Sequence, residues 1–531
     1  MIWDEHTYLM VDHAPVADEV NTSLVRDEAY KHPEPLVRLE DAALTVGGRA
    51  RSLGYKFVVR DGGVFRAWYQ VRGVREALEG QPQAAQGEPN TDRKSERFGK
   101  DSLMAYAESD DGIHFRPVRV GAVEVDGSKD NNLVAFDSGP EPRTRQCGFL
   151  YDPLDREYRY KCLYYRPCQS KDFEPGVLAR YPVATDRSWW AIWGIARSKD
   201  GLSWEPPDHT HNLVAANPEH ARLHRALDGG LVMSDQMISP VADWQYRNVK
   251  GWITYDGRVA HRIPDHLFKI PEHMTRCFAE FLGPTWDGVP WIQPHVGLAC
   301  ARKGPSIIAL NGFLYGCSGR EPGAETFAQV ADVGLCISDT GIKFQQVWPF
   351  RPFIRRGQRD AWDYGMVAQN CIVDHGDRTL FYYTGGDVGN LSSTYLPGLA
   401  WVPRDRFGYR LIRGYRDTAV RPRTARITMR PVTLPDAAAI TVNCSHVNDR
   451  RVIRVELADE AGHALPGYAF ADCRPVTTEG LRVPVVWQPD RTAAELAGRT
   501  VQIRIELDSP DCGAVYFDSP RLYAVYTKPA G

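Results

Sequence analysis

The chain has 531 residues, and its 64 Lys and Arg against 67 Asp and Glu give a formal net charge of -3. That balance argues against a dedicated nucleic-acid binder, because such proteins carry a basic excess. With 43% hydrophobic and 25% charged residues, the composition excludes disordered, collagen-like and fibrous classes. The 14 Trp, 24 Tyr, 46 Gly and 37 Pro instead favour aromatic-rich strands separated by tight turns, which is typical of an all-β protein.

The first segment, residues 1–45, is Pro-rich and irregular, and we expect it to wrap along the rest of the molecule. Asp4 and Glu5 stand where a secretory signal would have a basic region, and no uninterrupted apolar region follows them. No stretch of the sequence reaches the ~18 apolar residues of a membrane span. The 11 cysteines are scattered from Cys147 to Cys512 without a CxxC pair, which favours reduced thiols. A cytoplasmic location is therefore expected.

Residues 46–415 contain a repeated hairpin signal, in which an apolar run, a turn of Asp, Gly, Asn or Pro, and a second apolar run follow one another. The five copies are FVVRDGGVFRAWYQV (57–71), GFLYDPLDREYRYKCLYY (148–165), KGWITYDGRVAHR (250–262), PSIIALNGFLYGCS (305–318) and NCIVDHGDRTLFYYTGG (370–386). One hairpin plus one outer strand pair, repeated five times, predicts a five-bladed β-propeller with ~70 residues per blade.

A second repeat is a turn of Asp or Thr, then Gly, two variable residues and an aromatic. It occurs as DGIHF (111–115), DGLSW (200–204), DGVPW (287–291) and TGIKF (340–344), with a degenerate copy in RDRFGY (404–409). Glycine supplies a positive φ in such a turn, and an Asp or Ser side chain caps it. We expect each copy to close the outer strand pair of a blade.

The last segment, residues 423–531, has short alternating strands separated by Pro, Gly and Asp, and the hairpin repeat is absent from it. A separate β-sandwich, jelly-roll-like in its strand pattern, is the simplest interpretation. The fold class expected for the whole chain is therefore all-β, a five-bladed β-propeller followed by a β-sandwich.

Several segments give the chain a resemblance to a known group of enzymes. They are GVFRAWYQV (63–71), SKDNNLVAF (128–136), YDPLDREYRYKCLYY (151–165), DAWDYGMV (360–367) and TLFYYTGG (379–386). With them the chain resembles the five-bladed propeller glycoside hydrolases, nearest the family 32-like and family 43-like furanosidase group with a C-terminal β-sandwich. The first-blade Asp motif of family 32 has no counterpart here, and neither do its RDP and EC motifs, which argues against fructan hydrolysis by the usual residues.

Glycoside hydrolysis usually needs one carboxylic acid and one carboxylate, and crowding acids in one channel separates their pKa values. Scanning the predicted starts of the blades gives Asp130, Asp228 and Asp363 as candidate catalytic residues, with Asp360 beside the last. A turn-capping Asp is the alternative for each of them. Asp152 is expected to be a hairpin-turn residue.

Two glutamates are further catalytic candidates. Glu321 follows the fourth-blade strand together with Glu325, and either of the two could be the acid, with ordinary loop solvation as the alternative. Glu280 lies between apolar residues of the third blade. The resemblance implies that a Glu from this blade is the general acid, so Glu280 is a further candidate for that role.

The predicted substrate-binding residues are amides, aromatics and arginines near these acids. Asn131 and Asn132 could bond sugar hydroxyls or form a simple turn, and Trp362 and Tyr364 could form a sugar platform or belong to the core. Arg49, Arg51 and Arg320 could hold phosphate if the reaction is a phosphorolysis, and the predicted start of the fourth blade also has Lys303 and Ser306.

The functional hypothesis is a glycoside hydrolase or transglycosidase that acts on a furanoside or other small glycoside. The alternatives are a non-catalytic carbohydrate-binding propeller and a non-hydrolytic enzyme such as a glycoside phosphorylase. The expected partner is a small glycoside or oligosaccharide. Binding to nucleic acid or to a membrane is not expected, and a homo-oligomer is possible. No cofactor is predicted, and His209 with His211 is more simply a solvated loop than a metal site. A structural or channel Ca²⁺ is left open.

Overall fold

The computed structural model describes most of the chain. The described residues are 6–38, 52–72, 102–124, 127–135, 145–169, 189–205, 214–216, 221–241, 244–257, 259–270, 292–315, 330–348, 351–358, 360–387, 395–413, 422–510 and 519–528. Within these ranges the regular structure is almost entirely strand, with one 3₁₀ turn, η5 (Ala493–Leu496). The all-β prediction is confirmed. The described part holds no helix long and apolar enough to cross a membrane.

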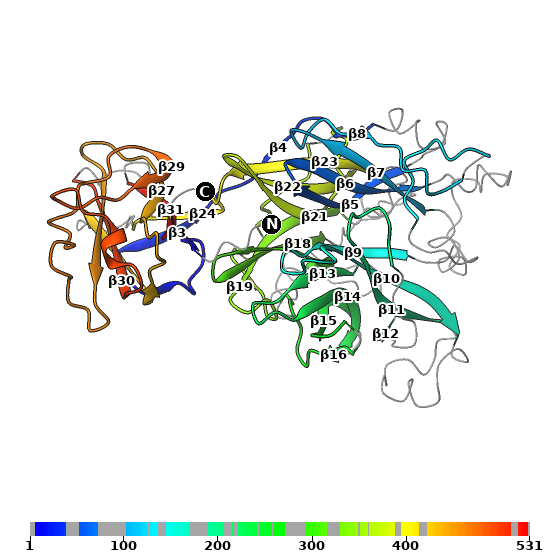
Figure 1. Cartoon of the computed structure of the whole chain (residues 1–531), viewed down its shortest axis with the longest axis horizontal. Coiled ribbons are helices and arrows are strands. Elements are labelled where there is room, and N and C mark those ends of the chain that lie inside the picture. Colours follow the sequence, from blue (N-terminus) through cyan, green and yellow to red (C-terminus); the bar gives the residue numbers. More distant parts are fainter. Residues whose placement is uncertain are drawn as a thin grey trace, which may run out of the picture.

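The larger part of the molecule consists of five antiparallel units of four strands each (Figure 1). The first has β5 (Ser52–Asp61), β6 (Val64–Arg72), β7 (Ser102–Ser109) and β8 (Arg116–Pro117), and the second has β9 (Arg145–Tyr151), β10 (Tyr160–Gln169), β11 (Trp189–Ser198) and β12 (Val214–Ala216). The third has β13 (Arg222–Arg225), β14 (Leu231–Val241), β15 (Trp244–Thr254) and β16 (His261–Arg262). These meanders follow the chain without crossovers.

The fourth and fifth units are joined into one sheet by a single parallel pairing between Ala331 and Met366. The fourth has β17 (Ile292–Lys303), β18 (Ser306–Tyr315), β19 (Val330–Ser338) and β20 (Gln345–Gln346). The fifth has β21 (Met366–His375), β22 (Arg378–Gly386), β23 (Tyr395–Pro403) and, from the N-terminal segment, β4 (Tyr30–Lys31). The last unit is therefore completed by a strand from the other end of the chain.

The five units form a closed ring. The first strand of each unit contacts the first strand of the next, in the order β5, β9, β13, β17 and β21, and β21 contacts β5 again. Apolar side chains fill the spaces between neighbouring units, as with Ile308, Val333 and Phe381 between the fourth and fifth. The first strands are thus the innermost of each unit.

The predicted outer turn is present in three units with the expected chemistry. The Oγ atoms of Ser109, Ser198 and Ser338 accept hydrogen bonds from the N–H groups of Gly112, Gly201 and Gly341 at 2.8–2.9 Å. All three glycines have a positive φ. Each glycine carbonyl also accepts a hydrogen bond from the preceding unit, donated by Tyr382 Oη, Trp68 Nε1 and His224 Nε2 respectively. The turn therefore locks neighbouring units together.

Two predicted hairpins differ from the structure. Asn311–Gly312 was expected to form the turn of the fourth hairpin, but both residues lie inside β18, and the turn is at Gly304 between β17 and β18. Segment 250–262 was expected to be an inner hairpin, but its Asp256–Gly257 turn joins the outer strands β15 and β16. The Gly257 N–H bonds to Thr254 Oγ1 in the manner of the other outer turns. The copy predicted at 287–291 lies outside the described residues.

The smaller part of the molecule consists of two sheets around a shared apolar core. One contains β29 (Gly480–Pro484), β27 (Thr441–Ser445), β31 (Arg521–Tyr526), β24 (Gly408–Ile412), β3 (Thr22–Arg26) and β1 (Thr7–Leu9), and the other contains β2 (Val16–Val20), β25 (Thr424–Met429), β30 (Thr500–Asp508), β26 (Val432–Thr433) and β28 (Val452–Ala458). Ile427, Ile503 and Val442 are among the fully buried side chains of this core.

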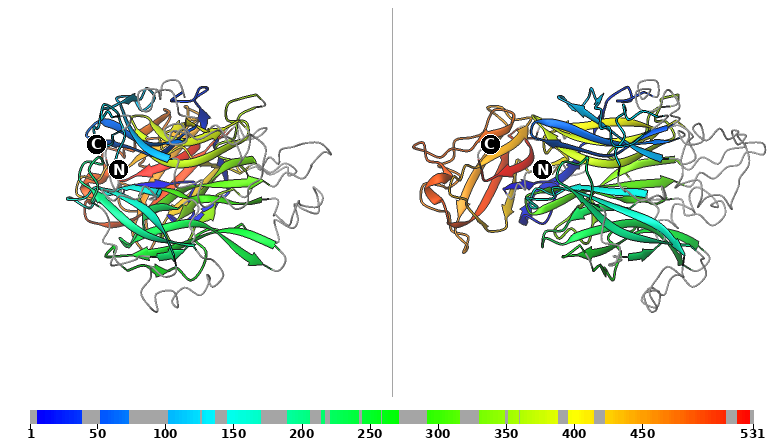
Figure 2. Two further views of the ribbon diagram at one scale, coloured as in Figure 1. Left: turned by 90° about the vertical axis from the view of Figure 1, so that its right-hand side faces the viewer. Right: turned by 45° about the vertical axis from the view of Figure 1, so that its right-hand side comes forward.

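The N-terminal segment and the predicted domain boundary therefore differ from the expectation. Strands β1, β2 and β3 belong to the smaller part, while β4 belongs to the ring. Strand β24, which falls within the segment 46–415 assigned to the propeller, pairs with β3 and β31. Figures 1 and 2 show the dark blue strands of the N-terminal segment beside the orange and red strands of the C-terminal region. A hydrogen-bond ladder with distant partners leaves no local signal in the sequence.

Candidate functional site

The site that we consider lies where the innermost strands converge. Close approach is achieved with glycines at the positions facing Arg222 of β13. A Cβ added to Gly148 of β9 would lie 2.8 Å from the Cα of Arg222, and one added to Gly297 of β17 would lie 2.6 Å from the carbonyl oxygen of Ser234. Only glycine allows main chains to pack at these distances. Strands β9 and β17 are therefore packed closely against the third unit around Arg222.

Five buried polar residues meet at this level, and we call them the axial cluster. They are Arg222, Gln236, His295, Gln369 and Asn370, from the third, fourth and fifth units, and each is less than 9% exposed. Burying polar side chains costs folding free energy unless their polar atoms have hydrogen-bond partners. The side chains of the axial cluster are therefore expected to bond to one another or to the main chain.

The guanidinium of Arg222 connects the third unit to the fifth. Its Nη2 donates to the carbonyl oxygen of Gln369 at 3.2 Å and to Oδ1 of Asn370 at 3.3 Å, and its Nη1 donates to Ala221 O at 3.2 Å. The Nδ2 of Asn370 donates in turn to Thr384 Oγ1 at 2.9 Å. The Arg222 guanidinium thus joins β13 to two consecutive residues of β21.

Two glutamines hold a bulge in β17 next to this charge. The register of β17 shifts between His295 and Ala299, and Val296 within the bulge has a φ of 68°. A β-branched residue with positive φ is an outlier that costs on the order of 1–3 kcal/mol and persists only where its surroundings fix it. Gln236 Oε1 accepts the N–H of Val296 at 2.9 Å, and Gln369 Nε2 donates to the carbonyls of His295 and Gly297 at 3.3 and 3.0 Å.

The axial cluster offers hydrogen-bond donors and acceptors and one cation. Amide, imidazole and guanidinium groups of this kind bind hydroxyl groups, and a guanidinium also suits phosphate or carboxylate. Asp235 is fully buried next to Gln236, but side chains alternate along β14, so its carboxylate lies on the other face of the sheet. The paired carboxylates of a glycosidase are not part of the described cluster.

The structure separates two of the predicted catalytic acids from this site. Asp130 is exposed, and its Oδ1 forms an ion pair with Arg119 Nε at 2.7 Å. Asp228 was expected at the start of an innermost strand, which is wrong, because it follows β13 and lies in the turn before β14. Its Oδ1 accepts the N–H of Gly230 and its Oδ2 accepts the hydroxyl of Tyr255, at 2.9 and 2.7 Å. Asp228 thus caps the turn that follows the end of β13.

Asp363 does precede an innermost strand, β21, but its carboxylate is enclosed. It is 2% exposed, and its Oδ2 accepts from Lys31 Nζ at 2.5 Å and from Tyr383 Oη at 2.9 Å. Because Lys31 belongs to β4, the ion pair ties the N-terminal strand to the fifth unit. The neighbouring Asp360 is exposed and has a φ of 71°.

The aromatic residues beside Asp363 divide between core and surface. Trp362 stacks on Tyr383 with ring centroids 5.8 Å apart, and its Nε1 donates to Pro33 O at 3.0 Å. Tyr364 is 43% exposed. Trp362 is therefore a packing residue of the fifth unit, whereas Tyr364 alone presents a ring to solvent.

The predicted amides are committed to local structure. Asn131 Nδ2 donates to the carbonyl of Val123 at 2.7 Å, and its Oδ1 accepts the N–H of Leu133 at 3.0 Å. Asn132 Nδ2 donates to Tyr69 Oη and to Tyr106 O at 2.9 and 2.8 Å. The remaining predicted site residues, Arg51, Glu280, Glu321 and Arg320, lie outside the described residues, as do Arg49 and Glu325.

The polar residues at the other end of the innermost strands are structural. Lys303, predicted at the start of the fourth blade, instead ends β17, where its Nζ is bound to Asp374 and, at 2.7 Å, to Asp405. Ser306 Oγ bonds to Asp12. As predicted, Asp152 is a hairpin-turn residue. Burial would raise the pKa of Asp152, but its bonds to Arg225 and Lys161 outweigh burial and lower it.

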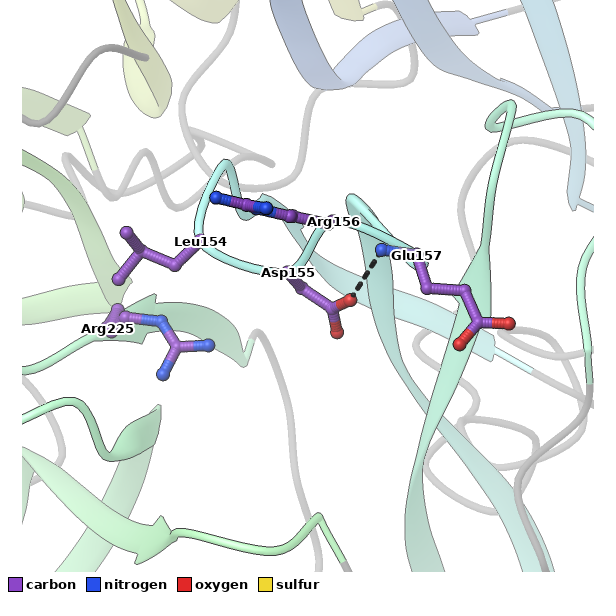
Figure 3. Close-up of a pocket in the computed structure, with 5 residues that line it drawn as sticks. All are labelled: Leu154, Asp155, Arg156, Glu157 and Arg225. Carbon is purple, nitrogen blue, oxygen red and sulfur yellow. Dashed lines mark hydrogen bonds between the residues drawn. The ribbon is translucent and has the colours of Figure 1, made fainter.

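An open pocket of about 570 Å³ lies beside this hairpin, between the second and third units (Figure 3). It is lined by Leu154, Asp155, Arg156, Glu157 and Arg225. Asp155 accepts the N–H of Glu157 and binds Lys161, and Arg225 binds Asp152 and the carbonyl of Gly229. Asp155 and Arg225 of this pocket thus hold the adjacent hairpin turns.

Within the described ranges, no group of three or more His, Cys, Asp or Glu side chains is placed to hold a metal ion. The Ca²⁺ left open by the sequence therefore stays a prediction.

Sequence reasoning missed all members of the axial cluster, because it examined acids before the strands instead of polar residues within them. A signal was present in MVAQNCIVDH (366–375), where Gln369 and Asn370 interrupt an otherwise apolar run. The same holds for Gln236 in LVMSDQMIS (231–239). Polar residues inside a buried strand indicate either a network or a site.

Comparison with known proteins gives structural likeness only at low identity. No protein-family model and no curated protein matches the chain. A solved structure described as "Glycoside hydrolase" is 12% identical, with a TM-score of 0.40, and covers 75% of this chain and 95% of its own. A structure of "The GH130 family of mannoside phosphorylases contains glycoside hydrolases that target beta-1,2 mannosidic linkages in Candida mannan" is 13% identical, with a TM-score of 0.38, and covers 76% and 96%. An N-acetylgalactosamine deacetylase from F. plautii in complex with blood group B trisaccharide is 14% identical, with a TM-score of 0.38, and covers 72% and 96%.

Proposed function

We propose that the chain is a carbohydrate-active enzyme, built as a five-bladed β-propeller with an appended β-sandwich, that binds a sugar at the strand-start end of the ring axis. The observation that carries this proposal is the closed ring of five innermost strands, with the axial cluster joining the third, fourth and fifth units inside it. Ligand sites in closed β structures occupy the mouth of such a ring, where strands from every unit contribute side chains.

The chemistry of the axial cluster supports a polyhydroxylated ligand. Arg222, Gln369 and Asn370 present a fixed guanidinium and two amides, the groups that exchange hydrogen bonds with hydroxyls. Together with the resemblance of the sequence to propeller glycoside hydrolases, this favours a glycosidase or transglycosidase acting on a furanoside or another small glycoside.

The catalytic carboxylates of this proposal are Glu280 and Glu321. Asp130, Asp228 and Asp363 are bound to Arg119, to a turn and to Lys31, so they are poorly suited to proton transfer. Of the five acids that the sequence analysis named as catalytic, Glu280 and Glu321 remain for the roles of acid and of base or nucleophile.

A glycoside phosphorylase is the second candidate, because a buried guanidinium such as that of Arg222 would also suit a phosphate ion. Phosphorolysis and hydrolysis differ only in the acceptor of the glycosyl group, so one assay separates them.

The test is a panel of aryl furanosides and pyranosides, each with and without phosphate. We expect turnover of at least one glycoside, and a loss of kcat of ~10²-fold or more in Glu280→Gln and Glu321→Gln, given the usual contribution of a general acid or base. Glu495→Gln, in the C-terminal part, is the matched control and should behave as the wild type. Sugar binding without turnover in the wild type would instead identify a non-catalytic carbohydrate-binding protein.

A further inference from the structure

Two buried amide oxygens of the fourth and fifth units have no hydrogen-bond partner in the part of the chain that the structure describes. They are Oε1 of Gln293 in β17 and Oε1 of Gln369 in β21. The two side chains are 1% and 0% exposed. An unpaired buried polar atom costs folding free energy, and such atoms are rare in native proteins. A ligand that supplies the missing hydrogen-bond donors would remove this cost.

The orientation of the Gln369 amide is fixed by its surroundings. Its Nε2 lies 3.3 Å from the carbonyl oxygen of His295 and 3.0 Å from that of Gly297. Carbonyl oxygens only accept hydrogen bonds, so the Gln369 atom that faces them must be the NH₂ group. The atom left over is therefore the oxygen, and Gln369 offers an acceptor to a ligand.

Gln293 occupies the axis side of a row that crosses the fourth unit. It pairs with Leu314 of β18, which pairs in turn with Ala331 of β19. Residues paired across strands share one face of a sheet. Leu314 and Ala331 pack against Met366 and Ala368 of β21. The side chain of Gln293 therefore lies on the face turned to the fifth unit, in the strand nearest the ring axis.

The two amides are neighbours along this face. A Cβ added to Gly312 would lie 3.2 Å from Gln369 Oε1, and Gly312 pairs with His295 of β17. Gln293 stands two residues before His295, nearer the start of β17, and two residues of a strand span roughly 7 Å. One small glycoside at the strand-start end of the axis can therefore reach both amides.

We propose that Gln293 and Gln369 are substrate-recognition residues of the sugar site. Gln369 Oε1 accepts a hydrogen bond from one hydroxyl group of the sugar, and the amide of Gln293 binds a second hydroxyl group. Amides suit such a ligand because they both donate and accept, as hydroxyl groups do. This inference rests on the proposed carbohydrate-active function.

A third glutamine of the same unit supplies a matched control. Gln346 lies in β20, the outermost strand of the fourth unit, and its Nε2 is also buried without a hydrogen-bond partner among the described residues. It shares the unpaired amide of Gln293 but not the position at the axis. Its replacement therefore measures what the removal of an unpaired amide alone does to the protein.

The test compares Gln293→Met with Gln346→Met in the full chain, since Met keeps the length of Gln without its amide. Replacing an unpaired buried polar group by an apolar one of similar shape is neutral or stabilising, so both variants should keep or raise Tm. With the aryl glycoside that the wild type turns over fastest, Gln293→Met should raise KM roughly 3- to 10-fold with kcat within twofold, because one neutral hydrogen bond to the substrate is lost. Gln346→Met should leave KM unchanged.

Monodeoxy versions of the same glycoside assign the two hydroxyl groups. One of them should bind equally to the wild type and to Gln293→Met, because the hydroxyl group that Gln293 binds is already missing. A different one should bind equally to the wild type and to Gln369→Met. The Gln369→Met variant should also have a lower Tm, because its bonds to two β17 carbonyls are lost.

Three outcomes would overturn the inference or its premise. If the KM of Gln293→Met equals that of the wild type for every glycoside, the recognition role is wrong while the enzyme function stands. A lower Tm of Gln293→Met with unchanged KM would instead make its amide a structural group. If the wild type neither binds nor turns over any glycoside, the proposed function fails and this role falls with it.

Discussion

At the level of single residues, the buried His224 couples the packing of the third and fourth units to pH. Burial lowers the pKa of His224 to about 4, although its hydrogen bond to the Gly341 carbonyl favours the protonated ring. The unfolded chain therefore takes up a proton below the ordinary pKa of 6.5, and the folded chain does so only near 4. Between these values the unfolded state binds more protons, so stability falls as the pH falls.

The expected size of this effect makes it measurable. A difference of about 2.5 pKa units corresponds to roughly 3 kcal/mol of unfolding free energy, present above pH 6.5 and lost progressively toward pH 4. His224→Gln can keep the bond to Gly341 O but cannot titrate, so its stability should depend less on pH over this range. Urea unfolding of both proteins at several pH values between 7 and 4 measures the difference. Parallel stability curves for the two proteins would show that His224 does not titrate as inferred.

At the level of elements, the turn between β17 and β18 in the fourth unit packs against the N-terminal segment. Gly304 has a φ of 60°, and a Cβ at this position would overlap the carbonyl oxygen of Thr7 in β1. Ser306 holds Asp12 of the same segment. The turn thus accepts β1 only because residue 304 is a glycine.

The corresponding turn of the fifth unit provides a control for this prediction. Gly376 has a φ of 55°, and a Cβ there would meet nothing within 4 Å. Gly376→Ala should therefore cost only the unfavourable left-handed φ, about 1–2 kcal/mol. Gly304→Ala should cost clearly more and displace β1 as well. Chemical unfolding of both variants measures the difference, and limited proteolysis should cut the N-terminal segment faster only in Gly304→Ala. Equal destabilisation would mean that β1 tolerates the added methyl group.

These elements also show how far sequence patterns reach. The hairpins at 57–71, 148–165 and 370–386 were predicted where they are found, because alternating apolar residues and a turn signal are local properties. Asp-Gly and Asn-Gly pairs, in contrast, occur in an inner turn at Asp228–Gly229, in an outer turn at Asp256–Gly257, and within a strand at Asn311–Gly312. The local sequence cannot distinguish these uses, because the pairing partners decide between them.

The site residues were harder to predict for the same reason. Asp363 was recognised as standing before a strand, but its ion pair with Lys31 joins residues 332 positions apart. The axial cluster depends on three separate units meeting around Arg222, and no spacing within one unit reveals that meeting. A search for buried polar residues within apolar runs would have found Gln236, Gln369 and Asn370.

At the level of the whole molecule, the ring and the C-terminal part share strands and core. The partners of β1 and β2 are β31 and β25, although both precede the ring in sequence. Lys303 of the ring contacts Asp405, whose Oδ2 accepts the hydroxyl of Tyr526 in β31 at 2.9 Å. The apolar cluster of the fourth and fifth units includes Leu9, Ala524 and Tyr526. The two parts are therefore bound by ladders, a buried ion pair and apolar packing at once.

This sharing predicts that the two parts unfold together. Removing the chain after Arg413 would leave β1 and β2 without their ladders and Lys303 without its Tyr526-supported partner, and unpaired strand edges favour aggregation. We expect residues 1–413 to be insoluble when expressed alone and to be recovered in soluble form when residues 414–531 are co-expressed as a second chain.

We also expect the intact chain to unfold in one calorimetric transition, with equal calorimetric and van't Hoff enthalpies if the process is reversible. Two separate transitions, or a soluble 1–413 fragment with the Tm of the intact ring, would contradict this coupling, because either result requires a ring that is stable without the strands β25 and β31.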